Sequence, residues 1–289
     1  MRQGVSRLAP LASLCWLAAC AGGGEKGAPA TNAAASPPSE PPVVTIVAKD
    51  FAFEGPDSIT AGMVTIKLVN QGPQLHHVQF VRLTEGKTYD EFLAALKEMK
   101  PGTPLPKWIL DVAGPNAPVP GGEQSLTQEL QPGTYAMTCF IDTPDHVPHV
   151  AKGMVHSLTV LPNNAPSAAA PVADVTVKMS DYQWEISPVI TSGKHVIRIE
   201  NTAAQSHELF LVQLAPGKTA QDLMKWSETY QGPPPGKPMG GITGMATGQV
   251  AYLPVDLGAG EYLLMCFLPD AKDGKPHLAH GMIKELTVS

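Results

Sequence analysis

The stretch Tyr262–Met282, YLLMCFLPDAKDGKPHLAHGM, places Cys266, His277 and Met282 along one short loop. An earlier stretch, Tyr135–Met154, reads YAMTCFIDTPDHVPHVAKGM and has the same residue types in the same order. The matching pairs are Tyr135 with Tyr262, Cys139 with Cys266, Phe140 with Phe267, His149 with His277, Gly153 with Gly281 and Met154 with Met282. A soft thiolate, an imidazole and a thioether together suit copper better than zinc, calcium or magnesium.

The two stretches belong to a longer duplication. Val44–Val160 aligns with Val175–Val288, and matched positions at one constant offset include Asp50 with Asp181, Phe51 with Tyr182, Gly62 with Gly193 and Asn70 with Asn201. Repetition on this scale indicates a tandem pair of domains. We therefore predict domains at 43–161 and 175–289, joined by a linker at 162–174 that is rich in Ala, Pro and Asn.

Each half opens with runs that alternate between apolar and polar residues. The runs are VTIVAKDFAF at 44–53 and MVTIKLVN at 63–70, then VTVKMSDYQW at 175–184 and HVIRIEN at 195–201. Alternation of this kind predicts half-buried strands, and connections rich in Gly and Pro favour an all-β fold. We predict two tandem Greek-key β-sandwich domains. Thr88 followed by Glu91 forms a capping box, and Thr219 begins a similar run, so each half should also contain a short helical insert.

The N-terminus has the pattern of an export signal. Arg2 and Arg7 precede an apolar stretch that ends Leu17-Ala18-Ala19-Cys20. This pattern resembles a bacterial lipoprotein signal, which implies a signal peptide at 1–19, a lipid on Cys20 and a protein tethered to a membrane of the cell envelope. An ordinary secretory signal is the alternative. Residues 20–42 contain no aromatic residue and no aliphatic residue larger than alanine, which predicts a flexible tether.

Charge and cysteine content restrict the function further. Removal of residues 1–19 would take away two arginines and change the net charge from −6 to −8, which argues against nucleic acid as a partner. Of four cysteines, Cys15 would leave with the signal and Cys20 would carry the lipid, so Cys139 and Cys266 remain. Exported proteins that depend on disulfides usually have more pairs than this, although a single bridge between these two cysteines stays open as an alternative.

Aligning the two halves selects the candidate ligands, because residues with one role in both halves should coincide. Of the nine histidines, only His76 with His207 and His149 with His277 coincide. Alternation along the strand places His76 on the inward face and predicts that His77 points outward. The candidate metal ligands are His76, Cys139, His149 and Met154 in the first half and His207, Cys266, His277 and Met282 in the second.

Three motifs carry a family resemblance, namely Asn70…His76-His77-Val78-Gln79-Phe80, Gly133-x-Tyr135-x3-Cys139 and His149-x4-Met154, each with its counterpart in the second half. With these motifs both repeats resemble the cupredoxin family of blue copper proteins over nearly their whole length. The resemblance implies one type 1 copper per domain, two per chain, each bound by two imidazoles, a thiolate and a weak axial thioether. It also implies single-electron transfer between redox proteins of the cell envelope, with His149 and His277 reaching the surface as the route for the electron.

Other functions predict other residues. Copper oxidases and nitrite reductases connect the blue copper to a second centre through a histidine beside the cysteine, and they contain His-x-His pairs. Here Thr138 and Phe140 flank one cysteine, Met265 and Phe267 flank the other, and the chain has no His-x-His pair, so we predict that it is not an enzyme. Two further alternatives remain: a lipoprotein that delivers or stores copper, and a metal-free interaction module that keeps these residues as core packing.

Overall fold

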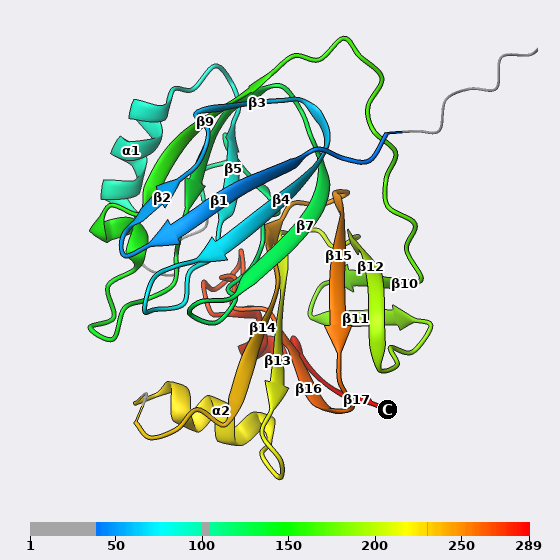
Figure 1. The fold of residues 1–289 in the computed structure, drawn as a ribbon. Helices are drawn as coiled ribbons and strands as arrows, with labels where there is room; N and C mark the ends of the chain where they lie inside the picture. Colours follow the sequence, from blue (N-terminus) through cyan, green and yellow to red (C-terminus); the bar gives the residue numbers. More distant parts are fainter. Residues whose placement is uncertain (1–38, 100–104, 230) are drawn as a thin grey trace, which may run out of the picture. The chain divides into compact units, whose positions relative to one another are not determined.

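The computed structural model describes residues 39–99, 105–229 and 231–289, which belong to one compact unit, Pro38–Ser289 (Figure 1). The predicted signal peptide at 1–19, the lipid site at Cys20 and residues 20–38 of the predicted tether lie outside the described residues. Within the described ranges, no helix combines the length and the apolar character needed to cross a membrane.

Strands dominate both halves, as the sequence predicts. The first half contains β1 (Val43–Lys49), β2 (Ala52–Glu54), β3 (Ser58–Thr60), β4 (Gly62–Asn70), β5 (Gln79–Leu83), α1 (Tyr89–Glu98), β6 (Ile109–Val112), β7 (Glu123–Leu130), β8 (Gly133–Thr138), a short 3₁₀-helix η1 (His149–Lys152) and β9 (Val155–Leu161). The second half contains β10 (Val175–Ser180), β11 (Gln183–Ser187), β12 (Gly193–Asn201), β13 (His207–Leu214), α2 (Ala220–Ser227), β14 (Gly236–Met245), β15 (Val250–Leu257), β16 (Gly260–Met265), η2 (His277–His280) and β17 (Ile283–Val288). The all-β prediction, with one short helix inserted in each half, is confirmed.

The strands form three sheets. One sheet has eight strands in the order β11-β10-β12-β15-β7-β4-β1-β2, and the other two have the orders β3-β9-β8-β5-β6 and β14-β13-β16-β17. In each half the first strand pairs in parallel with a nine-residue strand, β1 with β4 and β10 with β12. The two halves therefore repeat the same connection as well as the same sequence pattern.

Each core lies between two sheets. In the first half, Ile46, Ile66 and Leu68 from β1 and β4 belong to one buried cluster with Phe80 and Tyr135 from β5 and β8. Alternate residues along β4 are buried, which is the period-two pattern expected of a strand with one face on a core. The cysteine and methionine candidates of each half are members of that half's core cluster.

The two halves share one sheet, which periodicity along the chain does not reveal. β7 pairs antiparallel with β15 through Gln128 opposite Ala251 and Thr127 opposite Tyr252, so the larger sheets of the two halves form the single eight-stranded sheet. The predicted linker, 162–174, contains no strand or helix. Its Ser167 hydroxyl accepts a hydrogen bond from the backbone N–H of Met63 at 2.8 Å.

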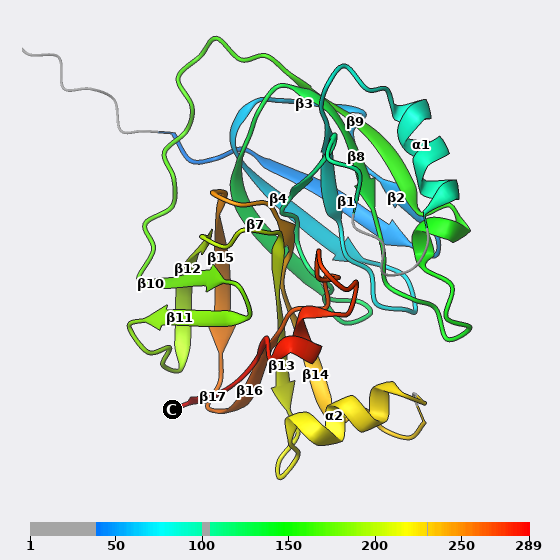
Figure 2. The ribbon, with the colours of Figure 1, turned by 180° about the vertical axis from the view of Figure 1, so that it is seen from behind.

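The two inserted helices, α1 and α2, lie at the outside of their halves (Figure 2) and differ in how far their side chains are buried. The predicted capping box of Thr88 and Glu91 begins α1, and Thr219 forms the same arrangement with Asp222 at α2. Phe92 of α1 is fully buried against β5 and β8 residues, whereas α2 has no fully buried residue. Packing therefore fixes α1 more firmly than α2.

A buried asparagine precedes the first histidine ligand candidate in each half. Asn70 donates its side-chain amide to Gln74 O at 2.8 Å and Pro118 O at 3.2 Å, and it accepts from Gly72 N at 3.0 Å. Asn201 makes the equivalent bonds to Gln205 O, Met245 O and Ala203 N. These contacts fix the loop that leads to His76 in one half and to His207 in the other.

We expect Asn70→Ala to lower the free energy of unfolding by roughly 2 to 3 kcal/mol, because it leaves buried backbone groups without their hydrogen-bond partners. Urea unfolding followed by circular dichroism measures the change. Gln71→Ala, at the exposed neighbouring position, is the control and should change stability by less than about 0.5 kcal/mol. Equal losses for the two variants would contradict a structural role for the Asn70 amide.

Candidate metal centres

The first centre gathers three predicted ligands from distant parts of the first half: His76 just before β5, Cys139 just after β8, and His149 at the start of η1. His149 Nδ1 lies 3.0 Å from His76 Nδ1 and 3.4 Å from Cys139 Sγ. The three side chains are fully buried, and their ligand atoms all lie within 4.8 Å of one another. The first centre is defined here as His76, Cys139 and His149.

The second centre repeats this arrangement with His207, Cys266 and His277. Cys266 Sγ lies 3.8 Å from His207 Nδ1 and 3.3 Å from His277 Nδ1. The two imidazole rings are 4.4 Å apart at their centroids, compared with 4.7 Å in the first centre. Donor atoms at these spacings are close enough to bind one ion at about 2 Å each. Two imidazoles and a thiolate form the donor set typical of blue copper sites.

Backbone hydrogen bonds hold each ligand loop in one shape. In the first half, Cys139 N donates to Met154 O, Val150 N to Cys139 O and Met154 N to His149 O, at 3.3, 2.8 and 3.0 Å. The second half has the same three bonds among Cys266, Met282, Leu278 and His277, at 3.3, 2.9 and 3.0 Å. Gly153 and Gly281 end the 3₁₀-helices at φ of 102° and 93°, a backbone conformation that other residues rarely adopt.

These bonds also fix the position of the fourth predicted ligand in each half. Met154 and Met282 are fully buried, and each pairs through its backbone with the cysteine of its own centre. Each methionine also shares a hydrophobic core with that cysteine. The structure therefore brings all four predicted residues of each half into one buried region.

A carboxylate fixes the orientation of the first histidine in each centre, and the sequence reasoning did not identify these acids as site residues. Asp50 Oδ1 lies 2.5 Å from His76 Nε2, and Asp181 Oδ1 lies 3.1 Å from His207 Nε2. A carboxylate beside Nε2 keeps the proton there and leaves Nδ1 free to bind a metal. The signal was present in the sequence, because Asp50 and Asp181 occupy equivalent positions of the repeat.

Burial determines the protonation of the ligand atoms. It lowers the pKa of His149 to about 4, with repulsion from His76 adding to the effect, and it lowers the pKa of His277 to about 4 in the same way through His207. Both imidazoles are therefore neutral near pH 7. Burial also raises the pKa of the Cys139 thiol to about 12 and that of Cys266 still further. A metal that binds either sulfur must therefore displace its proton.

The loop histidines do not reach the surface, contrary to what the family resemblance implies. His149 and His277 are both 0% exposed. The ring of Phe51 lies edge-on to His149 at 5.0 Å between centroids, and that of Tyr182 lies edge-on to His277 at 5.6 Å. The turn after the first strand of each half therefore covers the histidine that was expected to be open.

The prediction that His77 points outward is also wrong. His77 is 9% exposed, and its Nε2 accepts a hydrogen bond from Phe140 N at 2.9 Å. The strand β5 begins only at Gln79, so strand alternation does not apply at position 77. In the second half Glu208 takes this position and accepts from Phe267 N at 2.7 Å. Both side chains therefore brace the backbone immediately after the cysteine.

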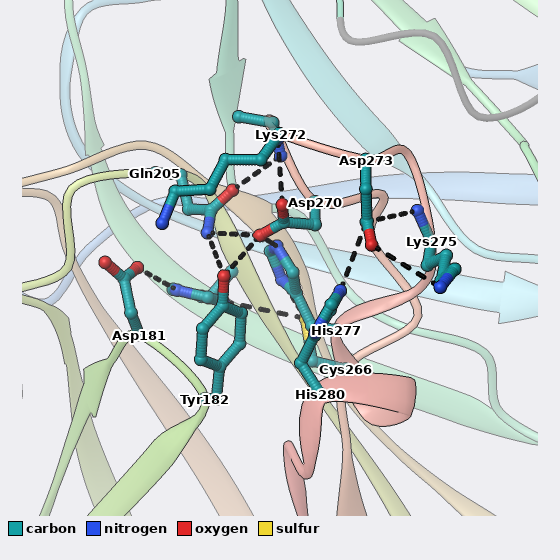
Figure 3. Close-up of polar contacts among 12 residues, drawn as sticks. Asp181, Tyr182, Gln205, Cys266, Asp270, Lys272, Asp273, Lys275, His277 and His280 are labelled. Atoms are coloured by element: carbon teal, nitrogen blue, oxygen red, sulfur yellow. Dashed lines mark hydrogen bonds and ion pairs between the residues drawn. The ribbon is translucent and has the colours of Figure 1, made fainter.

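Figure 3 shows a polar network beside the second centre. The Tyr182 hydroxyl donates to Asp270, and Asp270 also accepts from Gln205 Nε2 at 3.0 Å and Lys272 N at 2.8 Å. These hydrogen bonds, that from Tyr182 foremost, hold the pKa of Asp270 well below its usual range. In the first half Phe51 stands where Tyr182 stands and has no hydroxyl group. The two centres therefore share their donors but differ in their surroundings.

Asp270 also lies in a third group of possible metal ligands, with Asp273 and His280. His280 Nε2 lies 3.1 Å from Asp273 Oδ1, and Lys275 Nζ lies 3.7 Å from Asp273 Oδ2 (Figure 3). Hydrogen bonds already occupy the lone pairs of Asp270, and the lysine charge opposes a cation. This group therefore fixes the shape of the ligand loop.

The alternative of a disulfide between Cys139 and Cys266 is excluded. Both cysteines are free thiols, and each lies within its own centre.

No family model and no curated protein sequence matches the chain. Similar solved structures include auracyanin from Roseiflexus castenholzii, with 23% identity, coverage of 42% of this chain and 97% of that chain, and a TM-score of 0.28. They also include auracyanin A, a "blue" copper protein from Chloroflexus aurantiacus, with 24% identity, 42% and 100% coverage, and a TM-score of 0.29. The blue copper oxidase from Nitrosomonas europaea has 13% identity, 86% coverage of each chain and a TM-score of 0.27. At TM-scores this low, the chemistry of the two centres rests on their own residues.

The pKa of His77 gives a pH-dependent prediction for the metal-free protein. Burial, with repulsion from His149 and His76, lowers this pKa from 6.5 to about 3. Between these values only the unfolded chain binds a proton at position 77, so His77 reduces stability as the pH falls below 6.5. His77→Gln keeps an acceptor for Phe140 N but does not titrate. Relative to the unmodified chain, we expect the variant to gain about 2 kcal/mol between pH 7.5 and pH 5.

Urea unfolding of both metal-free proteins at the two pH values measures this difference. A stability difference for His77→Gln that stays constant with pH would contradict a neutral, buried His77.

Proposed function

We propose that this chain is an exported copper protein that binds one type 1 copper in each half and carries single electrons between redox proteins of the bacterial cell envelope. The observation that supports this most directly is the pair of buried His-Cys-His sets with converging Nδ1 and Sγ atoms. Met154 and Met282 would each offer a thioether to the copper of their own half. Held by these residues, a copper ion would supply single-electron transfer.

The residues of the chain supply what such a site needs. The backbone bonds of the ligand loops keep cysteine, histidine and methionine in place, and Asp50 and Asp181 orient the first histidine of each centre. Burial of the thiols keeps water away from the sulfur atoms. A site held this firmly needs little rearrangement when the charge of its metal changes.

Burial of the donors favours electron transfer over the alternatives. A catalytic metal site keeps a position open for substrate, whereas all three donors of each centre here are 0% exposed. Delivery of copper to a partner would also require access to the ligands. Transfer of an electron needs no such access, and the partly exposed rings of Phe51 and Tyr182 contact the buried loop histidines.

The location forms part of the same proposal. Cleavage after residue 19 and lipid attachment at Cys20 would hold the folded unit outside the cytoplasm, at the end of the tether 20–42. Redox proteins of the envelope would then be the partners.

A copper titration of residues 43–289 tests the two-site proposal. We expect an intense thiolate-to-copper absorption band that grows up to two copper ions per chain. Cys139→Ala and Cys266→Ala should each reduce the band and the bound copper by half, because each removes one thiolate. Met224→Ala, on helix α2 and outside the two core clusters that contain the cysteine and methionine candidates, is the control and should keep both coppers. A folded chain with no such band would overturn the electron-transfer proposal and leave a copper store or a metal-free module.

Asp181→Asn tests whether the carboxylate orients His207. We expect copper affinity at the second centre to fall roughly 10- to 100-fold, with the first centre unchanged, because loss of an outer carboxylate disturbs the ligand tautomer. Competition with a chelator in the Cys139→Ala background isolates the second centre. Asp174→Asn is the matched control, since Asp174 pairs with His195, away from the ligands. An equal loss in both variants would refute the orienting role.

A further inference from the structure

The two halves meet at a second place besides the shared sheet, where residues 113–118 lie against β14. Pro115 pairs with Ile242 and Pro118 with Met239 in antiparallel bridges. Thr243 N donates to Gly114 O at 2.9 Å, and Asn116 N donates to Gly241 O at 3.0 Å. We call this contact the junction.

Two glycines allow the junction to form. A Cβ atom on Gly114 would lie 1.9 Å from Val78 O, and one on Gly241 would lie 2.0 Å from Leu209 O. No larger residue fits without moving backbone. The junction therefore packs directly against the strands that follow the first histidine of each centre.

The junction has approximate two-fold symmetry in the repeat. With Cys139 and Cys266 aligned, Gly114 is equivalent to Gly241 and Asn116 to Thr243. Each half thus presents the same pair of positions to the other. The side chains at the second position differ, however, and so do their contacts.

Asn116 reaches from the first half into the second centre's surroundings. It is 3% exposed, and its side-chain amide donates to Glu208 Oε2 at 3.2 Å and to Ile242 O at 3.1 Å. Its carbonyl oxygen accepts from Ala117 N at 2.8 Å. Every polar atom of this buried side chain therefore has a partner, which fixes its orientation.

Glu208, the partner of Asn116, contacts the second centre on two sides. It follows His207 directly, its backbone N–H lies 3.4 Å from Cys266 Sγ, and its Oε1 accepts from Phe267 N at 2.7 Å. One carboxyl group thus connects the first half to the residue after the metal-binding cysteine. Glu208 is 7% exposed, so water contributes little to holding it.

At the first centre, a different set of hydrogen bonds holds the backbone after the cysteine. Thr243, the equivalent of Asn116, bonds through its hydroxyl to Gly114 and Val78 backbone atoms. His77, the equivalent of Glu208, accepts from Phe140 N within its own half. The brace at position 77 is therefore complete without a side chain from the second half.

We infer that the first half completes the second metal centre, with Asn116 as a positioning residue that holds Glu208 against the backbone after Cys266. The part of the inference that concerns copper affinity rests on the proposed copper function. The part that concerns the position of Glu208 does not. The two centres are thereby unequal: Asn116 of the first half holds Glu208 at the second centre, whereas the hydrogen bond that His77 accepts at the first centre lies within its own half.

Asn116→Leu tests the inference, because leucine has a similar size and no amide. Thr243→Val is the matched control at the symmetry-related position of the same junction. Both substitutions are introduced into chains that keep only one of the two candidate ligand cysteines. Cys139→Ala isolates the second centre, and Cys266→Ala isolates the first. Copper affinity, the thiolate-to-copper band, and hydrogen exchange of the Phe267 and Phe140 amides in the metal-free protein are the readouts.

We expect Asn116→Leu to weaken copper binding at the second centre by at least about tenfold and to shift its band, with the first centre unchanged. In the metal-free protein the Phe267 amide should exchange faster, while that of Phe140 does not change. Thr243→Val should change the copper affinity of the second centre by no more than about twofold. If Asn116→Leu does not fold, Asn116→Ala provides the same comparison.

Equal effects of Asn116→Leu on both centres, or none on Phe267 exchange and the second band, would overturn the inference. If the unmodified chain binds no copper, the proposed function fails. The exchange of the Phe267 amide then still decides whether Asn116 positions Glu208.

Discussion

Each centre depends on one backbone contact, the bond between the N–H of its cysteine and the carbonyl of its methionine. This bond closes a loop of unequal length in the two halves, with nine residues between Cys139 and His149 and ten between Cys266 and His277. The extra residue lies between the cysteine and the histidine of the second half, and the same three backbone hydrogen bonds form in both halves. The same hydrogen bonds around the donors thus form in loops of different length, and the longer loop of the second half also carries Asp270, which accepts a hydrogen bond from Tyr182.

Burial of the ligand side chains favours metal binding and costs free energy in the metal-free protein. In the first centre, burial keeps the imidazoles of His76 and His149 neutral, with their Nδ1 atoms 3.0 Å apart. It also leaves the Cys139 thiol protonated in the metal-free state. The carboxylates of Asp50 and Asp181 offset part of this effect, since they favour the charged form of His76 and His207. A bound cation would relieve the remaining cost, so metal binding and folding stability should rise together.

Periodicity and the internal repeat were sufficient to predict the strands and the inserted helices, and the structure places the eight candidate ligands in two buried regions. They failed where contacts between distant segments of the chain determine the orientation or exposure of a side chain. His77 lies before β5 begins, so alternation gave the wrong direction, and Phe51 and Tyr182 cover histidines from a turn some 100 residues away in the chain. Asp50 and Asp181 were aligned in the repeat, but only their contacts with His76 and His207 reveal a role. The β7–β15 pairing and the Asn116–Glu208 contact leave no local pattern in the sequence.

The symmetry of the junction has a consequence for the origin of the chain. An antiparallel contact in which Gly114 meets Thr243 while Asn116 meets Gly241 is the arrangement of an isologous interface, where two identical subunits offer the same patch to each other. A homodimer of single-half proteins, fused end to end after gene duplication, would leave this contact within one polypeptide. In a homodimer, any substitution appears on both sides of the axis at once. Fusion removes that restriction, and it allows Asn116 on one side and Thr243 at the equivalent position on the other.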